Sequence, residues 1–343
     1  MYKDKCVLIT GAAGTIGSEL AYFIYQNNPS KLILLDSAET PLFNLEEKLK
    51  YKENNTTIVS FVLGSITNKL LIQELFKTYS FDFLFHTAAY KHVPLLEKNP
   101  IAGVEVNCFG TKILADAAVN YKVKNFLFIS TDKVVEPANV MGATKLIAEN
   151  YINSLSYNNP NSTKFITLRF GNIIGSNGSV IPLFKYQLNN NHPITVTHQD
   201  ATRYFIEITK VVDLINESLK FAKSGDRLLI NMGKPQSILK IAKQTIKDLN
   251  LEEKNVRIDI IGLRPGEKLH EKLLANHCAL NNTKHPEIFQ IMGETIEPLK
   301  TLKSQLKILK SLNKTQNHFD VVRQLKTIVK NFKSHNSRFE ILD

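Results

Sequence analysis

The chain has 343 residues, a size that fits one large α/β domain and a smaller partner, each with a core of its own. Hydrophobic residues make up 43% and charged residues 22%, which excludes a disordered or fibrous protein. The formal net charge of +11 would suit a polyanionic partner, but aromatic and basic residues do not alternate as in nucleic-acid modules, so we expect no nucleic-acid binding.

Short apolar runs alternate with amphipathic segments along the first half of the chain. This alternation predicts a Rossmann-like α/β fold, a doubly wound parallel sheet with helices on both faces. The expected strands are Cys6–Thr10, Leu32–Asp36, Ile58–Leu63, Phe83–His86, Phe126–Ser130 and Phe165–Phe170. We assign residues 1–172 to this domain and expect some later segments to return to it.

The rhythm changes after Asn172, where glycine and proline residues interrupt shorter elements. We expect residues 173–290 to form mainly a smaller, C-terminal substrate-binding lobe. Residues 291–343 predict a basic helical segment, in which lysines and leucines recur at helical spacing. Its lysines indicate a solvated helix face, and a weak contact with an anionic membrane surface stays open.

The sequence also bears on location and on metals. No apolar run approaches the roughly 20 residues that span a bilayer, and the N-terminus lacks the pattern of a signal peptide, so we expect a cytoplasmic protein without a transmembrane segment. Cys6, Cys108 and Cys278 are widely spaced and have no metal-type partners, so we expect no metal site.

A glycine motif follows the first expected strand and opens a helix. Its residues Gly11, Gly14, Thr15, Ile16 and Gly17 would let the backbone approach a pyrophosphate at a helix N-terminus. The spacing is G-x-x-G-x-x-G rather than the usual G-x-G-x-x-G, and a turn without a ligand is the alternative. Asp36, at the end of the next strand and followed by Ser37, can accept hydrogen bonds from ribose hydroxyls and would repel a 2′-phosphate. The motif therefore favours NAD over NADP.

Further motifs resemble known enzymes. The glycine pattern, His86–Ala89, Asn107 with Gly110–Thr111, and Ser130–Lys133 resemble the extended short-chain dehydrogenase/reductase family. Tyr90–Pro94, Asn139–Lys145, Arg169–Asn172 and Gly262–Lys268 are similar to the UDP-N-acetylglucosamine 4,6-dehydratases of the polysaccharide biosynthesis family, of which the chain resembles the soluble catalytic part. The likeness runs from Lys5 to about Leu274, and it implies bound NAD, a UDP-sugar substrate and a homo-oligomer.

This resemblance implies a cycle of oxidation at sugar carbon 4, loss of water across carbons 5 and 6, and reduction at carbon 6. By resemblance, Lys133 takes the carbon 5 proton and Asp132 protonates the leaving hydroxyl, while Thr131 could hold the carbon 4 hydroxyl. We expect desolvation to lower the pKa of the lysine and to raise that of the aspartate. A surface pair that merely closes a strand is the alternative.

Met141 stands where a typical family member has tyrosine, four residues before the active-site lysine, Lys145. A thioether cannot accept a proton, although one dehydratase branch that the chain resembles also has methionine here. Lys145 lies one helical turn beyond on the same face and can still reach the nicotinamide ribose. We therefore hypothesise that Asp132 accepts the first proton and later passes it to the leaving group.

The remaining expected site residues rest on the same resemblance. The additional cofactor positions are Ser65, Ile66, Ala88, Ala89, Lys91 and Asn107. The substrate positions are Lys91, His92, Asn172, Ser179, Val180, Arg203, Arg264 and Glu267. Ser65 departs from the acid of many relatives, His92 is as readily structural, and surface salt bridging is the alternative for both arginines.

The sequence thus predicts NAD-dependent 4,6-dehydration of UDP-N-acetylglucosamine for bacterial glycan or polysaccharide synthesis. A nucleotide-sugar 4-epimerase is the alternative enzyme, but it needs no acid–base pair for water loss. A non-catalytic dinucleotide-sensing protein on the same fold is the alternative from another class, with Met141 as its sign of lost catalysis.

Overall fold

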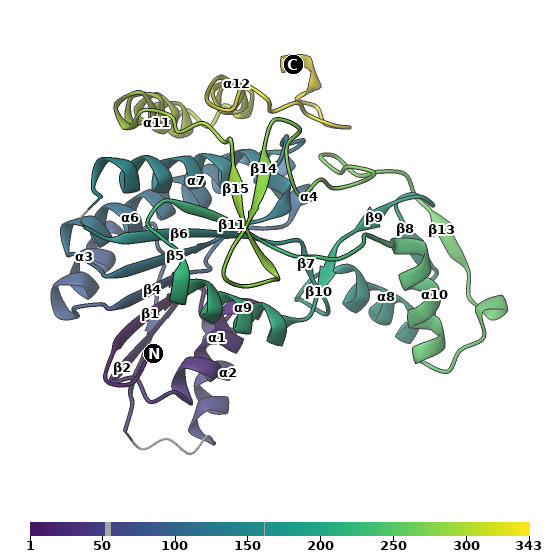
Figure 1. The fold of residues 1–343 in the computed structure, drawn as a ribbon. Helices are drawn as coiled ribbons and strands as arrows, with labels where there is room; N and C mark the ends of the chain where they lie inside the picture. The colour runs from purple at the N-terminus through teal and green to yellow at the C-terminus, as the bar shows by residue number, and fades with distance from the viewer. Residues whose placement is uncertain (52–55, 161) are drawn as a thin grey trace.

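A nine-stranded sheet forms the body of the protein in the computed structural model, which describes residues 1–51, 56–160 and 162–343 (Figure 1). Its seven central strands are parallel, and two antiparallel strands complete one edge. In spatial order the strands are β14 (Ala279–Asn282), β15 (Ile288–Met292), β11 (Asp226–Ile230), β6 (Lys164–Arg169), β5 (Asn125–Ile129), β4 (Phe83–His86), β1 (Cys6–Thr10), β2 (Lys31–Asp36) and β3 (Ile58–Leu63). The predicted Rossmann-like, doubly wound fold is confirmed.

Helices cover both faces of this sheet because its central strands are apolar on both sides. Along β1, Val7 and Ile9 face one core while Leu8 faces the other, and all three are fully buried. One face carries α1 (Thr15–Tyr25), α2 (Glu39–Lys50) and α9 (Ile208–Phe221). The other carries α3 (Lys69–Thr78), α4 (Val93–Lys98), α5 (Pro100–Gly103), the π-helical segment Val104–Gly110, α6 (Thr111–Asn120) and α7 (Val140–Asn158).

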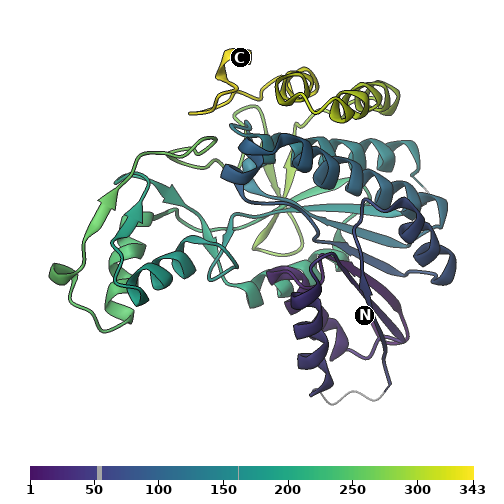
Figure 2. The same cartoon turned by 180° about the vertical axis from the view of Figure 1, so that it is seen from behind.

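A smaller lobe projects from one side of the sheet and has its own apolar core (Figures 1 and 2). It contains α8 (Val180–Asn189), β8 (Ile194–Val196), α10 (Ile238–Asp248), the short helical turn Glu253–Asn255 and β13 (Ile258–Ile260). Two short ladders lead into it, one formed by β7 (Asn172–Ile173) and β10 (Phe205–Ile206), the other by β9 (Thr202–Arg203) and β12 (Gln236–Ser237).

The lobe is discontinuous in sequence. The range 173–290 also contains elements of the large domain. The large sheet includes β11, β14 and most of β15, and α9 packs on one of its faces. The chain thus enters the lobe, returns to the sheet through α9 and β11, and enters the lobe a second time before it closes the sheet edge. These elements are later segments that lie in the large domain, as we expected of some of them.

The C-terminal segment forms α11 (Leu299–Lys314), α12 (His318–Ile328) and a last helical turn, Glu340–Leu342. The two helices lie on the outer side of α7 (Figure 1), with Leu302, Leu306 and Leu309 buried in the same core as α7. The lysines that we expected on a solvated face are exposed, namely Lys303, Lys307, Lys310 and Lys314. None of the helices in the described parts of the chain combines the length and apolarity that crossing a membrane requires.

Candidate functional site

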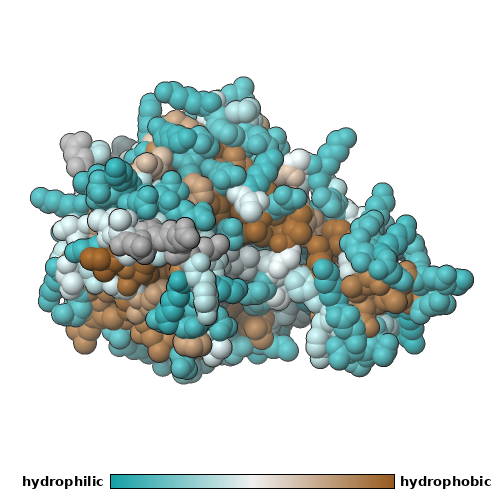
Figure 3. All heavy atoms as spheres, turned by 90° about the horizontal axis from the view of Figure 1, so that it is seen from below, coloured by the Kyte–Doolittle hydropathy of each residue, from teal (hydrophilic) through white to brown (hydrophobic). Residues whose placement is uncertain are grey.

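A cavity of about 600 Å³ opens where the carboxyl ends of the central strands meet the smaller lobe. This edge includes the switch point of the sheet, between β1 and β4, where doubly wound folds bind ligands. Seen from below, apolar surface gathers between the larger body and the lobe (Figure 3). Predicted site residues that line the cavity are Gly11, Gly14, Thr15, Ile16, Ala89, Lys91, His92, Thr131, Lys133, Met141, Lys145, Asn172 and Ser179.

The glycine motif makes a tight turn between β1 and α1. Gly11 has a φ of +68°, and a Cβ on it would lie 2.6 Å from the backbone of Ala88. Gly17 is equally confined, because its Cβ would lie 2.1 Å from the Gly11 carbonyl oxygen. Gly14 is the N-cap of α1 and has no side chain that could occupy this helix N-terminus. The turn therefore fits the pyrophosphate of a dinucleotide, whose charge the helix N-terminus favours.

Asp36 ends β2 beside this turn. Its carboxylate accepts one hydrogen bond from the Ala13 amide and one from the Ala38 amide, both at 2.9 Å. Each oxygen keeps a further lone pair, which a ribose hydroxyl can use. Ser37 follows at the surface. The position of this carboxylate fits the ribose of a dinucleotide that lies on the glycine turn.

Other expected cofactor residues lie behind the cavity wall. The Ser65 hydroxyl bonds that of Thr67 at 2.8 Å, and Ile66 is buried beneath Gly110. Ala88 packs against Gly11. Asn107, in the π-helical segment, bonds the backbone amide and carbonyl of Tyr90 at 2.8 and 3.0 Å. Asn107 thus fixes the segment that carries Ala89 and Lys91, and its own amide faces the protein.

The Thr131–Lys133 cluster follows β5 and is largely buried. Asp132 is 1% exposed, and its Oδ1 accepts hydrogen bonds from the Thr131 hydroxyl and the Lys133 ammonium, each at 2.9 Å. The ammonium also lies 3.3 Å from Asn172 Oδ1, on β7. The cluster is fixed to the neighbouring strand by a bond from the Asp132 amide to the Phe170 carbonyl. The Thr131 hydroxyl and the Lys133 amine thus line the cavity, and the Asp132 carboxylate, which is not in the lining, is bonded to both of them.

Glu271 was missed by the sequence analysis. Its carboxylate is buried and approaches the Lys133 ammonium to 3.6 Å. Burial acts to lower the pKa of Lys133, but the charges of Asp132 and Glu271 outweigh it and raise that pKa above its ordinary value. Our expectation of a lowered lysine pKa is therefore wrong for this arrangement, because desolvation acts on a cation that has two carboxylate neighbours.

Several buried polar atoms around the cavity have no hydrogen-bond partner in the described parts of the chain. They are Ser130 Oγ, Asp132 Oδ2, Ser179 Oγ and Glu271 Oε2. Burying such atoms without partners costs free energy, typically about 1–3 kcal/mol each. Ser130 and Ser179 line the cavity, so a polar ligand bound there could satisfy their hydroxyls, whereas Asp132 and Glu271 are not in its lining.

Met141 and Lys145 lie on the first turns of α7. Gly142 lets this helix approach the Thr131–Lys133 loop, because a Cβ there would lie 2.2 Å from the Lys133 carbonyl oxygen. Lys145 is 5% exposed; its ammonium donates to the Ile129 carbonyl at 2.7 Å and lies 3.8 Å from the ring centre of Phe128. Burial lowers the pKa of Lys145 to about 7, against the opposing effects of Glu149 and Cys108. Met141 is buried and lines the cavity, with no proton-accepting group.

The mouth of the cavity is basic. His92 packs beneath Gly178, and Lys91 precedes it on the same segment. Partial burial and the positive charges of Lys91 and Arg264 lower the pKa of His92. Ser179 caps α8, whose first residue is Val180. The arrangement fits an anionic group such as a diphosphate at this end of the cavity.

The two arginines and Glu267 form a network of their own, outside the lining of the cavity. The Arg203 guanidinium bonds Glu267 Oε1 at 2.9 Å and three backbone carbonyls of Thr202, Lys268 and Leu269. Arg264, whose side chain is 51% exposed, pairs with the other oxygen of Glu267 at 3.3 Å. In this arrangement both arginines hold the Gly262–Lys268 segment, and their proposed contact with a diphosphate stays a prediction.

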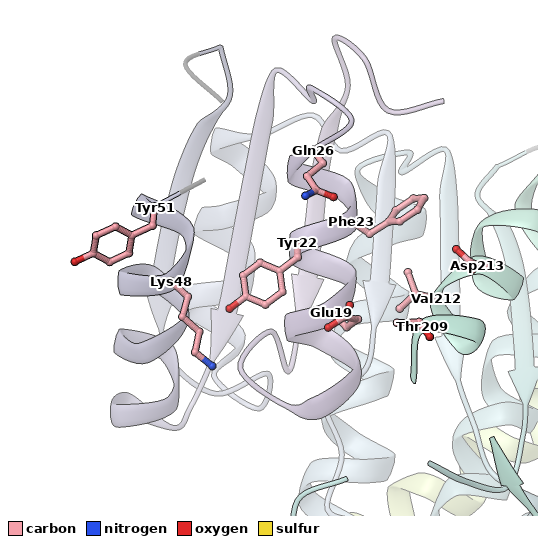
Figure 4. A pocket seen from close by; sticks show the side chains of 9 residues that line it. All are labelled: Glu19, Tyr22, Phe23, Gln26, Lys48, Tyr51, Thr209, Val212 and Asp213. Atoms are coloured by element: carbon pink, nitrogen blue, oxygen red, sulfur yellow. The ribbon is translucent and has the colours of Figure 1, made fainter. Parts of the chain in front are cut away.

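A second hollow, of about 640 Å³, lies between α1, α2 and α9 (Figure 4). No predicted site residue lines it. No three His, Cys, Asp or Glu residues in the described ranges are placed to share a metal ion. The first cavity is therefore the candidate site, and its lining also includes Tyr90, Ser130, Phe170, Ser176 and Asn177, none of which was predicted as a site residue.

Comparison with known proteins places the chain in a family. Residues 7–293 match the family described as polysaccharide biosynthesis protein. The chain belongs to this family. It is 41% identical over 284 residues to the capsular polysaccharide biosynthesis protein CapD of Staphylococcus aureus, a match that covers 83% of the chain and 46% of CapD. The chain thus spans less than half the length of this relative.

Two further similarities concern the enzyme class and the fold. UDP-glucose 4-epimerase of Rickettsia prowazekii is 30% identical over 281 residues, which cover 80% of the chain and 79% of that protein. The crystal structure of Pen from Bacillus thuringiensis is 34% identical, with a TM-score of 0.77 and coverage of 87% of the chain and 90% of Pen. The family member described here therefore shares its fold and most of its length with Pen.

Proposed function

We propose that this member of the polysaccharide biosynthesis family is an NAD-dependent 4,6-dehydratase of a UDP-sugar, with UDP-N-acetylglucosamine as the substrate. The observation that carries the proposal is the buried Thr131–Asp132–Lys133 cluster, in which Thr131 and Lys133 line one cavity with Lys145 and the glycine turn while Asp132 is bonded to both of them. An acid, a base and a cofactor cradle at one cavity are the parts that a dehydration through a keto sugar needs.

The residues present fit NAD as the cofactor. The glycine turn would hold its pyrophosphate, Asp36 its adenosine ribose and Lys145 its nicotinamide ribose. When bound, NAD supplies reversible oxidation and reduction of the sugar. Lys145 would be near half protonated at neutral pH, so its charge can change when a ligand displaces water from the cavity.

The cluster supports the proton transfers. Thr131 holds the carbon 4 hydroxyl, and Asp132 accepts its proton, since Met141 has no group that could. Asp132 then returns this proton to the hydroxyl that leaves carbon 6. Lys133, which lines the cavity, first releases one proton to solvent, then takes the proton from carbon 5 and returns it to carbon 5 when carbon 6 is reduced. Asn172, 3.3 Å from the Lys133 ammonium, helps to aim this amine.

A 4-epimerase is the second candidate, favoured by the similarity to the Rickettsia prowazekii enzyme. Such an enzyme would oxidise and reduce the same carbon and would use no second acid–base pair. A buried lysine bonded to a buried aspartate is costly to keep in a site that does not need it, because each ion loses its hydration. The buried pair therefore favours the dehydratase.

Product mass distinguishes the two enzymes. Purified protein incubated with NAD and UDP-N-acetylglucosamine should give a product lighter by one water; an isomer of unchanged mass would instead support the epimerase. Asp132→Asn should lower both cofactor reduction and water loss by about 100-fold or more, since one carboxylate serves both steps. Asp200→Asn, at a 64% exposed side chain, is the matched control. Unimpaired cofactor reduction in the Asp132 variant would refute the shared role.

A further inference from the structure

Glu271 is held against the catalytic cluster by the segment that leads back from the smaller lobe. A parallel bridge between Thr202 and His270 places Glu271 beside β9, which carries Arg203. Its side chain is only 4% exposed although it bears a carboxylate. A carboxylate this deeply buried needs cations nearby, and it has one in the Lys133 ammonium.

The Lys133 ammonium is surrounded by three oxygen atoms from three different segments. Asp132 Oδ1 lies at 2.9 Å, Asn172 Oδ1 at 3.3 Å and Glu271 Oε1 at 3.6 Å. The ammonium donates hydrogen bonds to Asp132 and Asn172, and it forms an ion pair with Glu271 at the longer distance. Glu271 supplies the second negative charge, and its other oxygen has no hydrogen-bond partner in the part of the chain that the structure describes.

Two further cations face the same carboxylate. Arg203 Nε and Lys268 Nζ each lie 4.0 Å from a Glu271 oxygen, but both have closer partners. Arg203 binds Glu267 and backbone carbonyls, while Lys268 donates to the Val135 carbonyl at 2.8 Å. Lys133 is therefore the nearest cation to Glu271, and in a buried site the attraction between them is stronger than in water.

We propose that Glu271 is the positioning residue of Lys133: it holds the amine against Asp132 and sets how readily the amine gives up its proton. The proposal rests on the proposed function, in which Lys133 must be neutral when it takes the carbon 5 proton. Asp132 takes part in both proton transfers, so its charge changes during the reaction. Glu271 takes part in neither and can therefore act on the proton affinity of Lys133 with a constant charge. Glu271 would thus determine the pH range in which the site works.

Glu271→Gln tests this directly, because it removes the charge and keeps the size of the side chain. An opposite charge at this distance changes a pKa by about one unit or more, so the pH at which Lys133 becomes half labelled by an amine-acetylating reagent should fall by about one unit. Mass spectrometry of the Lys133 peptide gives this readout without any turnover. The ascending limb of kcat against pH should shift in the same direction, with KM for UDP-N-acetylglucosamine within about twofold.

Two variants complete the design. Glu136 pairs with Lys272, and its side chain is 39% exposed. Glu136→Gln removes the same charge as Glu271→Gln and should leave the labelling pH of Lys133 as it is in the unmodified protein. Glu271→Asp keeps the charge and should retain most of the original labelling pH, which also covers a failure of the glutamine variant to fold. An unchanged labelling pH in folded Glu271→Gln would overturn the inference. If the unmodified protein removes no water from the sugar, the proposed function fails while the labelling result still stands.

Discussion

At the scale of single residues, the burial of Lys145 lowers its pKa and also lowers the stability of the fold. The side chain is almost fully buried, and its near neighbours are a backbone carbonyl and an aromatic ring rather than a carboxylate. Glu149, one turn along α7, is already committed to Arg169. Among the residues that the structure describes, no carboxylate forms an ion pair with this ammonium, so its desolvation penalty has no close counter-ion to offset it.

This penalty predicts a pH-dependent effect of Lys145→Met. The unfolded lysine has a pKa of 10.5 and the folded one about 7, so between these values the unfolded chain binds more protons and stability rises with pH. The variant should therefore be more stable than the unmodified protein by a larger margin at about pH 6 than at about pH 9. Urea denaturation at both pH values measures this margin. Lys307→Met, on the exposed face of α11, controls for the loss of one positive charge; equal margins at both pH values would contradict the buried penalty.

The sequence identified 13 of the 27 residues that line the cavity, but not the neighbours that distant segments supply. Thr131, Asp132 and Lys133 are adjacent in the chain and end a strand, so a local motif was sufficient to find them. Glu271 lies 138 residues beyond Lys133, and no motif marks it, because its role depends on how the lobe segment returns. The rise in the pKa of Lys133 was missed for the same reason.

At the scale of elements, the start of α7 is held by Glu97 and by the segment that follows α12. Glu97, on α4, is 4% exposed; one of its oxygens accepts the Val140 amide at 2.7 Å, and the other accepts the Ser337 hydroxyl. The tail that carries Ser337 also bonds through its backbone to Ala138 and Gly266. The residues after α12 therefore connect the start of α7 to the Gly262–Lys268 segment.

Glu97→Ala should remove the two hydrogen bonds by which Glu97 joins the start of α7 to Ser337. The change leaves the buried Val140 amide without its acceptor and frees Ser337, which should lower the free energy of unfolding by about 1–3 kcal/mol. Because Met141 follows Val140 directly, KM for the sugar nucleotide should rise as well. Chemical denaturation and steady-state kinetics measure the two effects. Glu340→Ala, at an exposed position of the same tail, is the control, and equal stability of the two variants would show that the junction does not matter.

Strands were easier to predict than their assignment to a domain. The expected strands start or end within one residue of β2, β5 and β6 because buried strands are continuous apolar runs. The same kind of run, Leu228–Ile230, gives no local sign that β11 joins the large sheet beside β6. The division of the lobe into two segments depends on this pairing, which only the fold reveals.

At the scale of the whole molecule, a buried ion network joins segments that are far apart in the chain. Arg169 on β6 pairs with Glu149 on α7 and with Glu294 beyond β15, both at 2.5 Å. Arg227 on β11 reaches the same Glu294 at 2.5 Å. Arg169 and Glu149 are almost completely buried. The network fixes the helix that carries the site to the centre and to the edge of the sheet.

Glu149→Gln should destabilise the entire fold rather than one element. It leaves a buried arginine with one carboxylate fewer, and breaking a buried pair typically costs about 3–5 kcal/mol. A single, shifted unfolding transition in guanidinium chloride, seen equally by fluorescence and circular dichroism, would show that the whole molecule responds. Glu287→Gln, which removes the surface partner of Lys210, should change stability by at most about 1 kcal/mol. A similar loss in both variants would argue against the network.

The position of α11 and α12 over α7 has a practical consequence for laboratory work. The family match stops at residue 293, before either helix begins. A recombinant fragment that ends at that boundary would lack the leucines of α11 that pack against α7. Its exposed apolar surface would favour aggregation during purification. Expression of the intact polypeptide is therefore the sensible starting point for any assay.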